Sequence, residues 1–288
     1  MLWISDQWKD YEVLDTSDGE RLERWGKYIL VRPDPQVIWN TPHAAPQWKK
    51  YDARYIRSNT GGGHWSDHQL PERWQIRYRD YLTFNVKPMN FKHTGVFPEQ
   101  AANWDFIREK VASAHRPVRV LNLFAYSGGA TLAAAAGGAE VFHVDASKGM
   151  VAWAKENAQA SGLADRPIHW IVDDCGKFIQ REIRRGRRYD GIIMDPPSYG
   201  RGPSGEIWKM ETSFFPFLRE TARLLTDNPL VVIINSYTTG LAPSAVSYAA
   251  DVVFGPDHGG KTAAGELGLP VKQTGLILPC GATGRWTP

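Results

Sequence analysis

The sequence predicts an α/β fold with a small β-rich domain at its N-terminal end. From about residue 100 onward, short apolar runs alternate with helical segments, which is typical of a parallel sheet with helices on both faces. The preceding part is rich in tryptophan, and turn clusters such as "DTSDGE" separate its extended segments. We therefore expect a β-rich domain over residues 1–90 that contributes to substrate binding, and an α/β domain over residues 91–288.

One strand of the β-rich domain can be located by the alternation of its side chains. In "RWQIRYRD", Trp74, Ile76 and Tyr78 fall on one face of a strand, and the arginines and glutamine between them fall on the other. The basic face of this strand is the part of the domain best suited to contact RNA. Most of the tryptophan rings are expected to lie in the core instead.

The α/β domain contains five apolar strand segments in order along the chain. These segments fall within residues 117–129, 140–147, 167–175, 189–197 and 229–237. Helical segments lie between them, at residues 130–139, 148–162, 176–188 and 213–225. The final segment, residues 268–287, is expected to close the sheet as a hairpin anchored by Trp286. Parallel sheets bind ligands at the carboxyl ends of their strands, so the residues after each apolar run are the candidate site residues.

Composition and charge narrow the class of function. The formal net charge of +3 permits nucleic acid as a partner without requiring it. Cys175 and Cys280 are the only cysteines, so we expect neither a disulfide framework nor a metal site. The first residues lack a basic start followed by an apolar core, and no apolar run approaches the roughly 20 residues that span a membrane. We therefore expect a cytoplasmic protein without a membrane partner.

The first strand ends in a glycine turn. Gly128 and Gly129 allow the backbone to turn sharply and to approach a ligand closely before a helix begins. The alternative is a tight strand-to-helix turn that needs glycine for its own geometry. The segment also lacks a complete G-x-G-x-x-G pattern, so the turn alone does not identify a ligand.

Carboxylates follow the second and third strands. Asp145 can accept hydrogen bonds from both hydroxyls of a ribose, and Asp173 or Asp174 can accept one from the amine of an adenine. Cys175 or Phe178 would then lie against the adenine ring. The alternative in both places is helix capping, by Asp145 or Ser147 at the first helix and by an aspartate at the second.

The fourth strand ends in Asp195, Pro196 and Pro197, followed by Ser198 and Tyr199. The prolines donate no backbone hydrogen bond and fix a rigid bend, which leaves the carboxylate and the neighbouring carbonyls exposed at the edge of the sheet. Such acceptors can orient an amine or a base edge, and a tyrosine can stack on a base. The alternative is a surface loop whose prolines merely end the strand.

Together, these motifs resemble a known family. "VLNLFAYSGGATLAAA", "VDAS", "IVDDCGKFI" and "DPPSYGRG" resemble the class I S-adenosylmethionine-dependent methyltransferases. The resemblance extends from about residue 90 to the C-terminus. It is closest to the branch of the bacterial large-subunit ribosomal RNA methyltransferases, which carry similar "NLFAYTG", "VDxS", "DD" and "DPPxF" motifs. The resemblance implies a Rossmann-like sheet, S-adenosylmethionine as cofactor with S-adenosylhomocysteine as product, and RNA as substrate.

The resemblance also implies roles for individual residues. Asp195, Pro196, Pro197 and Tyr199 would border the methyl group and the substrate, and form the catalytic set. The residues that would contact the cofactor come from the segment "FKHTGVFPEQAANWDFI", which also matches that branch, and from the four strand ends: Phe97, Gln100, Asn122, Phe124, Ala125, Tyr126, Ser127, Gly128, Asp145, Ala146, Ser147, Asp173, Asp174, Cys175 and Asp195. Among these, the backbone around Phe124 to Gly128 would hold the methionine end of the cofactor, Asp145 the ribose and Asp174 the adenine amine.

Two departures from the family leave the methylated atom open. Relatives that methylate cytosine carbon carry a nucleophilic cysteine after the fifth strand, where this chain reads "INSYTTG". Cys280 is the candidate that could replace this missing nucleophile. The alternative is that Cys280 is a buried structural cysteine. In amino-nitrogen methyltransferases the aromatic residue follows the prolines directly, whereas in this chain Ser198 intervenes.

Other functions remain open from the residues alone. The alternatives are a methyltransferase for a protein or small molecule, a nucleotide- or RNA-binding module without catalysis, and a dehydrogenase on the same sheet. The incomplete glycine fingerprint and the proline motif disfavour a dehydrogenase. The sequence also leaves homo-oligomerisation open.

Overall fold

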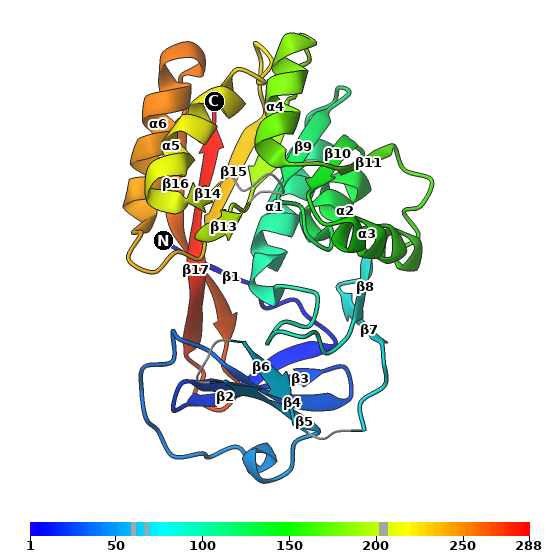
Figure 1. Cartoon of the computed structure of the whole chain (residues 1–288), viewed down its shortest axis with the longest axis vertical. Helices are drawn as coiled ribbons and strands as arrows, with labels where there is room; N and C mark the ends of the chain where they lie inside the picture. The colour runs from blue at the N-terminus through cyan, green and yellow to red at the C-terminus, as the bar shows by residue number, and fades with distance from the viewer. Residues whose placement is uncertain (59–61, 67–68, 202–206) are drawn as a thin grey trace. The chain divides into compact units, whose positions relative to one another are not determined.

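The computed structural model describes residues 1–58, 62–66, 69–201 and 207–288 (Figure 1). The chain forms two compact units. The α/β unit consists of Met1–Trp3, Ala102–Leu267 and Gly281–Pro288, and the β unit consists of Ile4–Ala101 and Gly268–Cys280.

The β unit extends past residue 90 and takes in part of the C-terminal hairpin. Its last segment before the α/β unit includes the short helix η2 (Pro98–Gln100), whose residues are buried, and the Ser5 hydroxyl donates a hydrogen bond to the Glu99 carbonyl. The backbone amides of Lys272 and Gln273 donate to the carbonyls of Val13 and Leu14. The first contact explains why the β unit extends to Ala101, and the other two explain why it includes Gly268–Cys280.

The α/β unit is built on an eight-stranded sheet with the order β1-β16-β17-β15-β12-β9-β10-β11 (Figure 1). Its five parallel strands are β9 (Arg119–Leu123), β10 (Glu140–Asp145), β11 (Ile168–Val172), β12 (Gly191–Met194) and β15 (Val231–Ser236). The remaining strands are β17 (Ile277–Thr287), which pairs antiparallel with β15, followed by β16 (Lys261–Pro270) and β1 (Leu2–Ile4). The predicted α/β fold is therefore confirmed, and β16 and β17 are the closing strands expected at the C-terminus.

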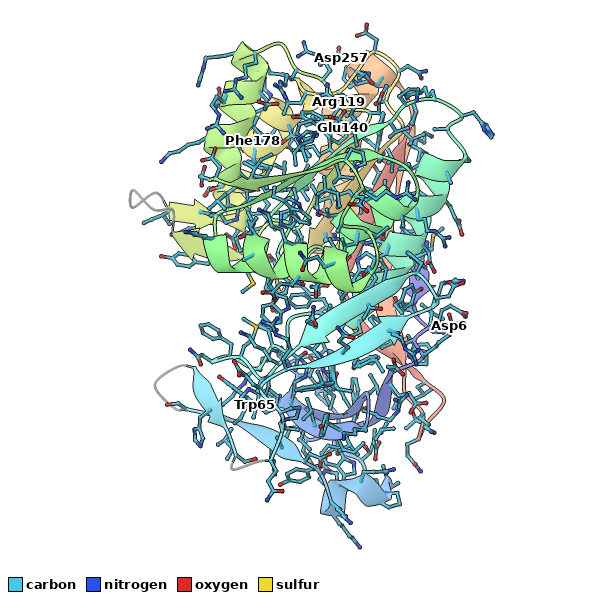
Figure 2. All side chains as sticks on the ribbon, turned by 90° about the vertical axis from the view of Figure 1, so that its right-hand side faces the viewer. Asp6, Trp65, Arg119, Glu140, Phe178 and Asp257 are labelled. Atoms are coloured by element: carbon cyan, nitrogen blue, oxygen red, sulfur yellow. The ribbon has the colours of Figure 1, made fainter. Side chains whose placement is uncertain are left out.

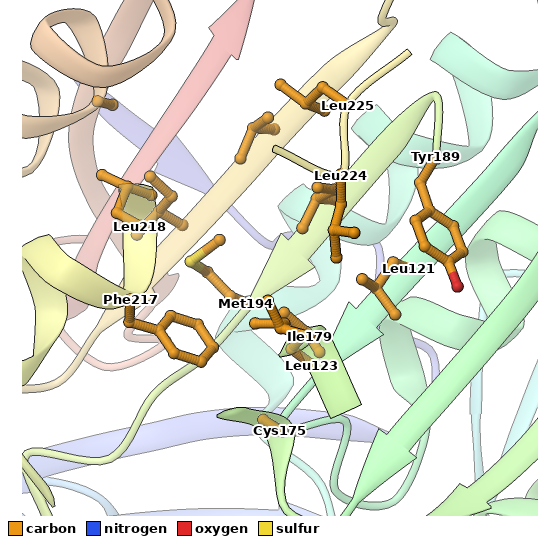
Figure 3. Packing of buried hydrophobic residues seen from close by; sticks show 14 of the residues in the cluster. Leu121, Leu123, Cys175, Ile179, Tyr189, Met194, Phe217, Leu218, Leu224 and Leu225 are labelled. Atoms are coloured by element: carbon orange, nitrogen blue, oxygen red, sulfur yellow. The ribbon is translucent and has the colours of Figure 1, made fainter. Parts of the chain in front are cut away.

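Six α-helices are described in or bordering this unit: α1 (Ala101–Ala112), α2 (Gly129–Ala136), α3 (Lys148–Ala160), α4 (Cys175–Arg184), α5 (Met210–Ala222) and α6 (Pro243–His258). Residues of α4, α5 and α6 pack on one face of the sheet, where Figure 3 shows Ile179 and Phe217 near Leu123 and Met194. Because side chains alternate along a strand, Asn122 points to the opposite face, where it contacts α2. Helices on both faces explain why the parallel strands read as continuous apolar runs.

At the amino end of the parallel strands, an ion pair joins β9 and β10. Arg119, the first residue of β9, lies next to Glu140, the first residue of β10 (Figure 2). The Arg119 Nε and the Glu140 Oε2 are 3.4 Å apart. This pair is partly exposed and stabilises the fold only modestly.

The β unit contains a five-stranded sheet and a separate hairpin. The sheet has the order β2-β3-β4-β5-β6, formed by Tyr11–Ser17, Glu20–Trp25, Tyr28–Pro33, Ala53–Arg57 and Gly63–Trp65. The hairpin pairs β7 (Trp74–Tyr78) with β8 (Leu82–Val86). In β7 the side chains of Ile76 and Tyr78 are buried and that of Arg77 is exposed, which confirms the predicted alternation.

Candidate functional site

The candidate site residues meet at the carboxyl edge of the parallel sheet. Leu123 at the end of β9 is in register with Val144 of β10 on one side and with Met194 of β12 on the other. The chain thus builds outward from β9 through β10 and β11, and then crosses to β12 on its other side. Such a reversal of strand order is where α/β sheets bind ligands. Phe124, Asp145 and Asp195 therefore lie on neighbouring strand ends, as predicted.

The turn after β9 has an unusual backbone. Phe124 and Tyr126 have φ angles of 55° and 49°, in the left-handed region that residues other than glycine rarely adopt. Three contacts stabilise the turn: the amide of Ala125 donates to the Val144 carbonyl at 3.1 Å, that of Phe124 to the Cys175 Sγ at 3.3 Å, and that of Tyr126 to the Asp145 Oδ2 at 2.9 Å. The surrounding structure thus supports a strained turn, a feature that clusters at ligand sites.

Glycine is required at the two positions of this turn for different structural reasons. Gly128 has a φ of 90° and precedes α2 as its N-terminal cap residue. A Cβ atom on Gly129 would lie 2.5 Å from the ring of Trp104, so only glycine fits beside that ring. Local geometry and packing therefore account for both glycines, in line with the alternative that the sequence left open.

Asp145 is half-buried at the end of β10 and accepts two backbone hydrogen bonds. Its Oδ1 accepts from the amide of Ser147 at 2.8 Å and its Oδ2 from the amide of Tyr126. Burial raises the pKa of Asp145, and the two backbone hydrogen bonds offset only part of that rise. Ser147, and not Asp145, caps α3, because its hydroxyl accepts from the amide of Met150. Each oxygen of Asp145 keeps a further lone pair for a ligand hydroxyl, and Ala146 and Ser147 are exposed beside it.

The aspartates after β11 both have partners in the protein. The Oδ1 of Asp174 accepts from the amide of Lys177 at 2.9 Å, so Asp174 is the N-cap of α4. The Asp173 carboxylate pairs with the Arg181 guanidinium. The capping alternative therefore holds for Asp174, whose second carboxylate oxygen is the acceptor that a ligand amine could use.

Two predicted cofactor residues have side chains in the core rather than at the edge. The Asn122 amide donates to the Thr131 hydroxyl at 2.9 Å, and that hydroxyl contacts the Nδ1 of His143. The Cys175 thiol is buried between the turn and β10, next to the Val144 carbonyl. Asn122 lies on the opposite face of β9 from its buried neighbours Leu121 and Leu123, and Cys175, the first residue of α4, belongs to the core cluster. Their contacts hold the strand end and the turn in place.

The other predicted residues of the turn and of the preceding segment are mostly buried. Ala125 and Ser127 are buried, and the Ser127 carbonyl accepts from the Asn157 amide at 2.9 Å. Phe97 and Gln100 belong to the β unit, where Phe97 is the N-cap residue of η2 and its carbonyl accepts from the Gln100 amide. Their contact with the cofactor remains a prediction from the resemblance.

The motif after β12 bends away from the sheet and is held by its backbone. Asp195 is half-buried, Pro196 is buried and Pro197 is exposed, and Tyr199 is 53% exposed. Tyr199 begins β13 (Tyr199–Arg201), which pairs antiparallel with β14 (Ile207–Lys209). The tyrosine is thus exposed, whereas the aspartate and the proline after it are less exposed than the sequence predicted.

Two contacts fix the serine that interrupts the family pattern. The Ser198 carbonyl accepts from the amide of Met210 at 3.1 Å, and the Ser198 hydroxyl accepts from that of Thr238 at 2.8 Å. Thr238 follows β15, so Ser198 connects two neighbouring strand ends. The sequence indicated neither contact, because no local pattern marks a side-chain hydrogen bond between two loops.

Neither cysteine is prepared to act as a nucleophile. Burial raises the pKa of Cys175 and that of Cys280 well above the ordinary thiol value. Both thiols are buried and unpaired with another cysteine. A buried, protonated thiol is unreactive, which supports the structural interpretation of Cys280.

The sequence predicted neither a metal site nor a membrane-spanning segment. Within the part of the chain that the structure describes, no three His, Cys, Asp or Glu side chains cluster as metal ligands do. No helix of the described residues has the length and apolarity to cross a membrane.

The chain is similar to proteins of known family. A family model for S-adenosylmethionine-dependent methyltransferases matches residues 28–244. The crystal structure of the SAM-dependent methyltransferase from Agrobacterium tumefaciens is 36% identical with a TM-score of 0.93, covering 100% of this chain and 93% of that one. A second solved structure, complexed with SAH, is 20% identical with a TM-score of 0.74, covering 98% of this chain and 76% of that one, and shows the same fold.

Curated relatives match over a shorter region. The ribosomal RNA large subunit methyltransferase K/L of Shewanella sp. (strain MR-4) is 31% identical over 156 residues, which is 53% of this chain and 21% of that relative. The chain thus spans about a fifth of the length of the curated relatives that it matches. The family model and the Agrobacterium structure cover most of the chain, and both agree with the strand-end motifs: the chain belongs to the S-adenosylmethionine-dependent methyltransferase family.

Proposed function

We propose that this protein transfers a methyl group from S-adenosylmethionine to RNA, and that its substrate is ribosomal RNA. One observation carries the proposal: Asp195, Pro196 and Pro197 end the strand next to β9, where the sheet reverses its order, and Asp145 ends the neighbouring strand on the other side. Acceptors for the cofactor and acceptors for a substrate therefore flank the same turn.

The residues at the strand ends fit the cofactor. Asp145 would hold the ribose hydroxyls, because its carboxylate is half-buried and pairs with no cation among the described residues. The second oxygen of Asp174 would accept from the adenine amine, and the backbone from Phe124 to Gly128 would hold the methionine end. Phe97 and Gln100 keep the role that the resemblance implies.

The chemistry asked of the protein is alignment. S-adenosylmethionine, when bound, supplies a methyl group that is already electrophilic. The chain therefore has to hold the acceptor atom in line with that methyl group. The Asp195 carboxylate and the neighbouring Pro196 carbonyl would accept hydrogen bonds from the group to be methylated. The exposed Tyr199 ring would stack on its base.

The state of the two thiols supports transfer to nitrogen or oxygen. Methylation of a pyrimidine carbon requires attack by a thiolate on the ring. Cys175 and Cys280 are the only cysteines of the chain, and both are buried with raised pKa values. A non-covalent reaction at a heteroatom therefore fits this site better.

Support for RNA comes from the curated relatives, which are named as ribosomal RNA methyltransferases. The test is tritium transfer from labelled S-adenosylmethionine into total RNA from a strain that lacks the gene. Label in RNA that disappears with Asp195→Ala would support the proposal. Label in the protein or small-molecule fraction, with none in RNA, would replace the substrate. No label in any fraction, despite cofactor binding, would indicate a binding module without catalysis.

A further inference from the structure

Trp208 contacts both sides of the candidate site. It is a half-buried residue of β14 and lies far along the chain from the turn after β9. Its indole Nε1–H donates to the Pro197 carbonyl at 2.6 Å. Its ring also packs against Phe124, with ring centroids 5.7 Å apart. One side chain thus contacts the predicted cofactor turn and the predicted acceptor motif.

The hydrogen bond determines which carbonyl of the motif remains available. At 2.6 Å it is slightly shorter than the ordinary range for an N–H donor, which begins at about 2.7 Å. The next carbonyl, that of Ser198, is bonded to the Met210 amide. Among the described residues, none donates to the Pro196 carbonyl. Trp208 therefore fixes the bend directly after Pro196, whose carbonyl lies next to Asp195 and has no donor among these residues.

The ring contact supports a strained residue. Phe124 has a positive φ of 55°, and its amide is bonded to the buried Cys175 thiol. Its ring lies in a three-ring cluster with Trp208 and Phe217, in which the Trp208 and Phe217 rings are 5.3 Å apart at 89°. Edge-to-face aromatic contacts of this kind hold rings in defined orientations. Loss of the Trp208 ring would therefore release the Phe124 ring from one of its two aromatic neighbours in the cluster.

We infer that Trp208 is a positioning residue that connects the cofactor turn to the acceptor motif. Its ring holds Phe124 for cofactor binding, and its N–H holds the Pro197 carbonyl so that Asp195 and Pro196 face the acceptor. The second part rests on the proposed function, whereas the first part requires only that the cofactor binds at the turn.

Two substitutions separate the ring from the hydrogen bond. Trp208→Phe keeps an aromatic ring beside Phe124 and removes the N–H donor, and Trp208→Ala removes both. Trp170→Phe is the matched control, because Trp170 is a half-buried tryptophan of β11 that packs on His143. Thermal melting of each variant shows whether it is folded.

The first readout is the affinity for S-adenosylhomocysteine by calorimetry. We expect Trp208→Ala to weaken binding at least about fivefold, and Trp208→Phe and Trp170→Phe to stay within about twofold. Unchanged affinity of a folded Trp208→Ala variant would overturn the connection to the cofactor turn. If that variant does not fold, the ¹⁵N indole resonance of Trp208, assigned by its loss in Trp208→Phe, decides instead. It should shift when S-adenosylhomocysteine is added, and a constant resonance would overturn the connection.

The second readout is the rate of methyl transfer into total RNA. Trp208→Phe is expected to lower kcat about tenfold while KM for S-adenosylmethionine changes little, because misalignment of the acceptor slows transfer without loss of binding. An unchanged kcat would overturn the role of the hydrogen bond. If the unmodified protein labels no RNA, the proposed function fails, and the affinity comparison still decides the role of the ring.

Discussion

Two carboxylates, Glu23 in the β unit and Asp145 in the α/β unit, have opposite surroundings. In the β unit, Glu23 of β3 is fully buried and accepts from the Arg32 guanidinium at 2.5 and 2.8 Å and from the Tyr11 hydroxyl at 2.6 Å. In the α/β unit, Asp145 is half-buried at a strand end and accepts from two backbone amides. One carboxylate is saturated by protein cations, and the other is held in position by the backbone.

The pKa values reflect this difference. Burial raises the pKa of Glu23, but the Arg21 and Arg32 guanidiniums outweigh that effect and lower it to about 2. Burial likewise raises the pKa of Asp145, and there the backbone hydrogen bonds do not reverse the rise. A carboxylate paired with cations serves the fold, whereas one held without a cation can serve a ligand. The comparison therefore contrasts Glu23, which is paired with cations within the fold, with Asp145, which keeps acceptor capacity for a ligand.

The largest expected effect is on stability, at the saturated site. Glu23→Gln leaves the buried Arg32 guanidinium without its anion and Arg21 with Asp34 alone, and should lower the free energy of unfolding by about 3 kcal/mol. The surface acid Glu12, which pairs with Arg24 at 2.9 Å, provides the control, and Glu12→Gln should cost less than about 1 kcal/mol. Urea denaturation of both variants measures the difference. Equal costs would contradict the comparison.

The same acid predicts a pH dependence. Because the pKa of Glu23 is lower in the folded protein, its contribution is complete above the ordinary value of 4.5 and is lost as the pH falls toward about 2. Unfolding at pH 6 and at pH 3 should therefore show a loss of stability that Glu23→Gln reduces. An identical loss in the variant would assign it to other groups.

The next effect is on the rate. Asp195→Ala should lower methyl transfer at least about a hundredfold and leave the affinity for S-adenosylhomocysteine nearly unchanged, because the carboxylate would bind the acceptor group and would border the cofactor only at its methyl end. Initial rates and calorimetry on one preparation measure both. Full activity would mean that the bend after β12 is only structural.

A smaller effect is expected at Asp145. Asp145→Ala should weaken S-adenosylhomocysteine binding at least about tenfold, through the loss of charge-assisted hydrogen bonds to the ribose. Because Asp145 pairs with no cation among the described residues, Asp145→Asn should lower stability far less than Glu23→Gln does. Unchanged affinity in both Asp145 variants would show that the ribose lies elsewhere.

The sequence predicted the strand ends better than the contacts between them. Asp145 and Asp195 could be placed because long apolar runs mark buried parallel strands, and register then brings their ends together. Trp208 could not be predicted, because β13 and β14 have three residues each and show no periodicity. The role of Asp174 stayed open between capping and ligand binding, since a cap and a ligand acceptor need the same carboxylate at the same position. Only the folded structure distinguishes which oxygen is used.

A smaller effect is expected at Asp174, where it distinguishes helix capping from ligand binding. Asp174→Ser keeps a good N-cap for α4 but shortens the side chain, whereas Asp174→Ala also removes the cap and should cost about 1 kcal/mol more. If Asp174 contacts the adenine amine, both variants weaken S-adenosylhomocysteine binding by several-fold. If it is only a cap, Asp174→Ser binds as the unmodified protein does.

Cys280→Ser should leave methyl transfer within about twofold, because a buried protonated thiol takes no part in the reaction. Tritium transfer measures this rate, with melting as the check of folding. A folded but inactive variant would restore a covalent mechanism and carbon methylation.

The cofactor is the central assignment, and isothermal titration of the unmodified protein with S-adenosylmethionine and S-adenosylhomocysteine tests it most directly. Binding of both at one site, weakened by Asp145→Ala and retained by Asp195→Ala, is the predicted result. Absence of binding by a folded protein would contradict the assignment, and with it every ligand-binding role of the strand ends.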